Sequence, residues 1–149
     1  MADVLQNGVV AKRRSPLEVV QTDGPNQLVF LPAAGISGPE LTDNGIVYRS
    51  GTIEVSMSYY GRPDAGVYTS VHRIAPDGTW RWADLSCLHV ACGHGVLQDV
   101  PSNAPNQAVA SKRVTQHATA LRRILPRLLT DDAISLLRRC QGQQLPLAE

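Results

Sequence analysis

The chain has 149 residues, of which 43% are hydrophobic, with fourteen Lys and Arg against thirteen Asp and Glu. This length fits one domain, residues 1–149, with its own core, and the balanced charge gives no strong field that would attract polyanions. We find no apolar run long enough to span a membrane and no apolar signal region at the start, and the three cysteines lack the spacing of a disulfide scaffold.

The first predicted element is a β-hairpin over residues 7–32. Two short β-prone runs, LEVVQ and QLVFL, flank the turn-prone segment TDGPN. The basic triplet before them, KRR, is too short for a nucleic-acid arm and indicates a solvated face. Residues 32–44 have the composition of a loop. The run IVYRS then opens a sheet region, with Gly51 as a bulge or a turn.

A sheet is predicted over residues 45–92. In GTIEVSMSYYG, apolar Ile53, Val55 and Met57 alternate with polar residues, which is the period of a strand with one buried face. The run VYTSVHRI repeats this alternation, and TWRWADLSCLHV follows as a third strand. The connections RPDAG and APDG carry the residues that turns need. The middle of the chain therefore predicts an antiparallel meander with one apolar and one polar face.

A pair of helices is predicted over residues 107–141. Apolar residues recur there at steps of three and four: Val114, Ala118, Leu121, Leu125 and Leu128. Pro126 should kink or end the first helix nearby, Thr130 should cap the second, and Gly142 should stop it. Hairpin, sheet and helices in this order predict an α+β fold.

The number of elements also predicts an oligomer. Two helices supply one covering layer, so one sheet face stays without cover, and bare sheet edges tend to pair with another chain. We expect a homodimer whose sheets join edge to edge and whose helices reach across the partner.

The order of elements resembles the coat proteins of small single-stranded RNA bacteriophages. The resemblance rests on the segments TDGPNQLVFLP, GTIEVSMSYYGR, GVYTSVHRIAP, WRWADLSCLHV and ALRRILPRLLTDDAISLLRRCQGQQLP. It implies a structural protein, not an enzyme, that forms an intertwined dimer and then an icosahedral capsid in the virion. It also implies synthesis in the cytoplasm of a bacterial host, and genomic RNA bound on the sheet face that looks into the capsid, away from the helices.

The polar face of the predicted sheet offers candidate RNA contacts. Hydroxyl, aromatic and imidazole side chains can touch phosphates and stack on unpaired bases without a strongly basic chain. The candidates are Arg49, Thr52, Ser56, Ser58, Tyr68, Ser70, His72, Arg81 and Ser86. Glu54 lies on the same face and would repel phosphate. The alternative is an ordinary solvated face.

A cluster of thiols and imidazoles follows the third strand. Cys87, His89, Cys92 and His94 are spaced C-x-H-x-x-C-x-H, and these residue types bind zinc. One-residue gaps on a strand would point Cys87 and His89 in parallel, so we favour packing over a metal site, and we expect no cofactor. Disulfides between subunits, through this segment or Cys140, stay open. The alternative function is a small non-viral dimeric module that binds a ligand or zinc.

Overall fold

The centre of the molecule is a five-stranded antiparallel sheet in which each strand pairs with the next one in the sequence. The computed structural model describes residues 3–4, 10–11 and 14–144. The strands are β3 (Ser37–Leu41), β4 (Gly45–Arg49), β5 (Ile53–Tyr60), β6 (Gly66–Ile74) and β7 (Trp80–Asp84). The predicted α+β class and the predicted meander are confirmed, with turns where RPDAG and APDG stand.

The alternation of side chains along the strands gives the sheet an apolar inner face. Tyr48, Val55, Val71 and Ala83 occupy neighbouring register positions on four successive strands, and none is more than 1% exposed. The next row brings Ile46, Met57 and Thr69 together. Because residues opposite each other in a ladder share a face, the polar residues between these rows lie on the outer face.

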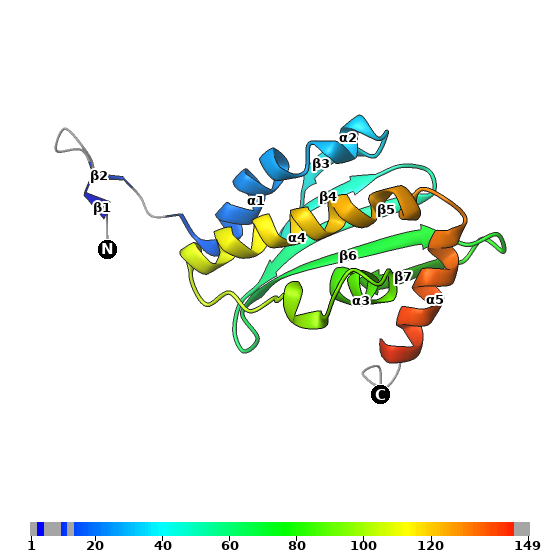
Figure 1. Ribbon diagram of the computed structural model, residues 1–149. Helices are drawn as coiled ribbons and strands as arrows, with labels where there is room; N and C mark the ends of the chain where they lie inside the picture. The colour runs from blue at the N-terminus through cyan, green and yellow to red at the C-terminus, as the bar shows by residue number, and fades with distance from the viewer. Residues whose placement is uncertain (1–2, 5–9, 12–13, 145–149) are drawn as a thin grey trace.

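Helices cover the inner face (Figure 1). Helix α1 (Pro16–Gln27) and helix α4 (Gln107–Leu128) lie side by side across the sheet, and α5 (Asp132–Gln144) packs on β7. Helix α3 (Leu85–Ala91) contacts both α4 and α5. No helix in the described part of the chain covers the outer face, and none there is long and apolar enough to cross a membrane.

The hairpin predicted over residues 7–32 is wrong. Two short strands, β1 (Asp3–Val4) and β2 (Val10–Ala11), pair with each other near the start of the chain, but α1 and the short helix α2 (Phe30–Ala33) occupy most of the range. A capping box starts α1: the amide of Glu18 donates to Ser15 Oγ at 3.1 Å, and the amide of Ser15 donates to Glu18 Oε1 at 2.8 Å. This motif outweighs the β-branched run that follows it.

Gly24 makes no turn, although its neighbours Asp23 and Pro25 suggested one. It is buried in α1, and a Cβ at this position would lie 2.8 Å from Ile46 Cδ1. Glycine therefore lets α1 approach β4 closely. Pro25 lies near the end of the helix, where the loss of one backbone hydrogen bond is tolerated.

Two further boundaries differ from the prediction. The third long strand ends at Asp84, and Leu85–Ala91 forms α3 instead of continuing the sheet to residue 92. The predicted loop at 32–44 contains the edge strand β3. Both segments break the period of two, since Leu85 and Leu88 are spaced as in a helix and all five residues of β3 are exposed.

The C-terminal helix pair is confirmed. The predicted apolar stripe of α4 is buried throughout: Val114, Ala118, Leu121, Leu125 and Leu128. Pro126 lies two residues before the end of α4, and the amide of Asp132 donates to Thr130 Oγ1 at 3.3 Å. Helix α5 runs through Gly142 to Gln144, so the predicted stop is wrong.

Candidate functional site

The outer face of the sheet carries most of the predicted contact residues. Ser56 pairs with Ser70, and Ser58 pairs with Tyr68, across β5 and β6. His72 follows on β6, opposite Trp82 of β7. All of these except the exposed Trp82 are half-buried, and the Ser56 and Ser70 hydroxyls are 2.9 Å apart. The strand period therefore brings Ser56, Ser58, Tyr68, Ser70 and His72 onto one surface, as the sequence predicts.

This surface is hollowed between the ends of β5, β6 and β7. The hollow has a volume of about 550 Å³. Its floor is made of serines from the strands, and the β5–β6 turn forms one wall. The lining residues are Ser56, Ser58, Tyr60, Gly61, Arg62, Pro63, Asp64, Tyr68, Ser70, Trp82 and Asp84.

Aromatic rings stand around the hollow. The rings of Tyr60 and Tyr68 are 5.9 Å apart and tilted by 50°, and His72 stacks on Trp82 at 6.2 Å. Tyr60 is 50% exposed and Trp82 is 43% exposed. Exposed rings of this size are unusual on a plain solvated face, and they offer flat apolar surfaces on which another ring can stack.

Tyr68 is held in place by the β5–β6 turn. Its hydroxyl donates to the backbone carbonyl of Asp64 at 2.8 Å. Burial raises the pKa of Tyr68, and the nearby carboxylates of Asp64 and Asp84 raise it further. The phenol therefore stays protonated near neutral pH and fixes the ring at the edge of the hollow.

The charges on the outer face suit phosphate poorly. Arg49 forms ion pairs with Glu40 and, at 3.1 Å, with Glu54, so this guanidinium is already neutralised. The hollow itself is lined by Arg62 but also by two carboxylates, Asp64 and Asp84. Stacking and hydrogen bonding to neutral groups are the chemistry that this surface can offer.

Two predicted contact residues do not lie on the outer face. Arg81 pairs with Arg73, which pairs with the buried Ile53, so both arginines lie on the inner side of the sheet. The strand keeps regular alternation from Trp80, and this alternation places Trp82 outward. Ser86 belongs to α3 and not to a strand. The predicted position of Arg81 and Ser86 on the outer face is therefore wrong.

Two more predicted residues lie on the periphery. Arg49 is on the outer face, at the far end from the hollow. Thr52 precedes β5 and lines a different hollow near α5. Tyr60, Arg62, Asp64 and Trp82 were missed. The alternation of Trp80 and Trp82 with Arg81 and Ala83 was the signal that could have identified Trp82.

The cysteines and histidines after β7 do not converge. In α3, Cys87 and His89 are two residues apart and point to different sides, which corrects the parallel arrangement expected on a strand. Cys87 lies close to Cys140, and burial raises the pKa of Cys140 to about 12. His89 Nε2 lies 3.0 Å from Asp99 Oδ2. No group of three or more metal-binding side chains gathers among the described residues.

Comparison with known proteins does not add to this site. No protein-family model matches the chain, and the comparisons with curated proteins and with solved structures give no significant match.

Proposed function

We propose that the chain is the subunit of a self-assembling shell that holds single-stranded RNA against the outer face of its sheet. The observation that carries this proposal is the division of the sheet: helices cover its inner face, and the outer face bears an aromatic-rimmed hollow that no described helix covers. The element order of sheet and C-terminal helix pair supports it through the resemblance to coat proteins.

The mode of RNA binding follows from the charge of the face. With Arg49 already paired and two carboxylates at the hollow, phosphate contacts contribute little. Unpaired bases instead stack on Trp82 and Tyr60, while serine hydroxyls of the floor donate to base edges. Each neutralised phosphate releases counterions, so a base-dominated interface has a shallow dependence of affinity on salt. Weak contacts of this kind become effective when a shell repeats them many times.

The sheet edges support pairing through β7. Edge strand β3 carries Pro39 and an irregular register against β4, two features that block the addition of another strand. Edge strand β7 has neither feature, and its register against β6 is regular over five pairs. A second copy can therefore extend the sheet antiparallel along β7, and the outer faces of the two copies then form one continuous surface.

The experiment compares two tryptophans of β7. Trp80 and Trp82 lie on the same face and are 48% and 43% exposed, but only Trp82 lines the hollow. Purified without nuclease, the wild type should form particles of megadalton mass with an absorbance ratio that indicates nucleic acid. Trp82→Ala should assemble but contain several-fold less RNA, and Trp80→Ala should match the wild type.

Two outcomes would overturn the proposal. Light scattering that finds only monomers or dimers at micromolar concentration would exclude a shell, and particles free of nucleic acid would exclude the RNA role. In the first case, the hollow of about 550 Å³ favours a dimeric module that binds a small molecule, because this volume lies in the range of ligand pockets.

A further inference from the structure

A second hollow lies on the opposite side of the sheet, between α5, the end of β6 and the start of the β6–β7 turn. Its volume is about 570 Å³, and the residues that line it come from four segments. They are Thr52, Arg73, Ile74, Ala75, Pro76, Asp131, Ile134, Ser135 and Arg138. On the helix side, residues 131, 134, 135 and 138 follow the spacing of one helical face, which turns Arg138 toward the strand that carries Arg73.

Arginines replace the apolar pattern in this part of the inner face. The other inner rows are apolar or neutral, but the last row consists of Ile53, Arg73 and Arg81. Arg73 and Arg81 are directly opposite each other on neighbouring strands, an arrangement that costs free energy because like charges repel. Hydrogen bonds from Thr79 are the main reason why the pKa of the Asp77 carboxyl is lowered. Arg81 and Arg138 both lie close enough to lower it further. The three guanidiniums thus share one corner of the fold.

Within this cluster, Arg73 has a hydrogen-bond donor that the described residues leave unused. Arg73 is half-buried, and its Nε is shielded from solvent without a hydrogen-bond partner among the described residues. A buried donor without a partner is costly, and an anion that accepts from it would remove the cost. The nearby carboxylate of Asp77 is already partly engaged, since it accepts from the Thr79 hydroxyl at 2.6 Å and from the Thr79 amide at 3.0 Å.

We propose that Arg73 and Arg138, with Arg81 beside them, form a binding site for a phosphate group. Guanidinium groups present paired donors that match the oxygens of a phosphate, and the hollow leaves room for the group that carries it. The site is separate from the proposed RNA surface, since it lies on the helix-covered side of the sheet. Its ligand is a free phosphate compound or a phosphate of a nucleic-acid backbone.

The test is a titration of the protein at constant ionic strength. Binding is detected by calorimetry and by the NMR signal of the Arg73 Nε–H group. The probes are inorganic phosphate, a nucleoside monophosphate, and a trinucleotide without terminal phosphates; sodium chloride is the control. The first two probes represent the free source and the third represents the backbone. Saturable binding of any of them that shifts the Arg73 signal supports the site. Responses to all three that equal the response to chloride would overturn it.

Variants separate a site from a structural cluster. Arg73→Gln and Arg138→Gln should each weaken binding at least roughly tenfold, because each removes charged hydrogen bonds to the anion. Arg138 is exposed, so Arg138→Gln keeps the test valid even where Arg73→Gln fails to fold. Arg122→Gln, an exposed position on α4, is the matched control and should bind as the wild type does.

Asp131 provides a change of opposite sign. Its carboxylate lines the hollow and opposes an anion there. Asp131→Asn should therefore tighten phosphate binding several-fold. If the arginines only helped to pack α5 against the sheet, phosphate affinity would be equal in Arg73→Gln, Arg138→Gln, Asp131→Asn and the wild type. That result would contradict the proposal.

Discussion

At the scale of single residues, His117 is the clearest case of a titratable group that the fold keeps neutral. It is 1% exposed on α4; its Nε2–H donates to the Pro101 carbonyl at 2.8 Å, and its Nδ1 accepts from the Thr69 hydroxyl at 2.8 Å. Burial lowers the pKa of His117 from 6.5 to about 4. Burial is what keeps the imidazole uncharged, because removing the charged form from water costs free energy that the two hydrogen bonds do not repay.

This residue predicts an acid-sensitive fold. The unfolded chain binds a proton at His117 below its pKa of 6.5, whereas the folded chain binds it only below a pKa of about 4. The contribution to stability is therefore complete above 6.5 and is lost as the pH falls from there to 4. Between about pH 7.5 and about pH 5 the free energy of unfolding should drop by about 2 kcal/mol from this group. Urea unfolding at the two pH values measures the drop.

Two variants test this prediction: one replaces His117, and the other replaces a different histidine as the control. His117→Leu should lower stability at neutral pH, because it leaves Thr69 and Pro101 without their partner, and it should flatten the pH dependence between 5 and 7.5 by about 2 kcal/mol. His94 is exposed, so His94→Gln should keep the wild-type slope. An unchanged slope in His117→Leu would show that other groups cause the acid sensitivity.

At the scale of elements, the sequence predicted best where a strong period met clear turns. β5, β6 and the two C-terminal helices were assigned correctly because their apolar residues recur regularly over many residues. In the strands the apolar residues recur at steps of two, and in the helices they recur at steps of three and four. α1 was misread because β-branched Val19 and Val20 and the segment around Gly24 have strand and turn preferences when taken alone. The capping box and tertiary packing together override these preferences: both valines are 0% exposed, and Gly24 packs against Ile46.

The candidate site shows the same limit. The face of each strand residue was predictable for β5 and β6, so Ser56 and Tyr68 were placed correctly. In β7 the prediction of the faces was wrong, because Arg81 was taken for an outward residue. The hollow itself was not predictable, because its walls come from the β5–β6 turn and from Trp82, which meet only after the strands pair.

The stripe of α4 gives a prediction at this scale. Leu121 is 0% exposed, whereas Leu129, just after the helix, is 44% exposed. Leu121→Ala should lower the free energy of unfolding by about 2–5 kcal/mol, since it removes buried methyl groups and leaves a cavity. Leu129→Ala should change it by less than about 0.5 kcal/mol. Denaturant unfolding compares the two, and similar losses would contradict the assignment of the buried stripe.

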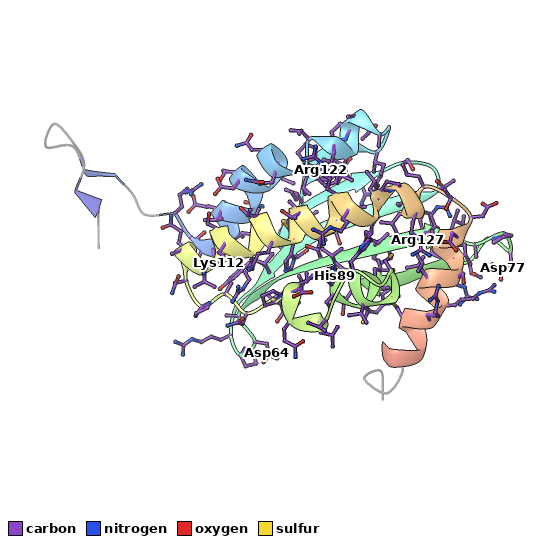
Figure 2. All side chains as sticks on the ribbon, in the orientation of Figure 1. Asp64, Asp77, His89, Lys112, Arg122 and Arg127 are labelled. Carbon is purple, nitrogen blue, oxygen red and sulfur yellow. The ribbon has the colours of Figure 1, made fainter. Side chains whose placement is uncertain are left out.

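At the scale of the whole molecule, we propose that the β6–β7 turn, residues 75–79, is where contacts between subunits of the proposed shell vary. It lies at one end of the sheet, with Asp77 near its tip (Figure 2). The amide of Gly78 donates to the Ala75 carbonyl at 2.9 Å, and Gly78 has a φ of 86°, which glycine adopts without strain. These features hold the turn in one shape at the edge of the molecule.

In the proposed shell, shortening this turn should change particle size. Deletion of Pro76 and Asp77 removes the tip and leaves β7 in place, so dimers should form while larger assemblies differ in diameter by electron microscopy. Asp77→Asn keeps the length and serves as the control. Particles of wild-type size from the deletion variant would exclude a role for the turn in assembly.

The side-by-side packing of α1 and α4 determines when the chain can complete its fold. These helices contact each other, yet the entire sheet separates them in the sequence. A nascent chain on the ribosome thus finishes all five strands before the second half of the covering layer emerges. Until then the part of the apolar inner face that α4 covers is open to water, and contacts between distant segments form slowly. Synthesis itself becomes the interval in which this protein most needs protection from aggregation.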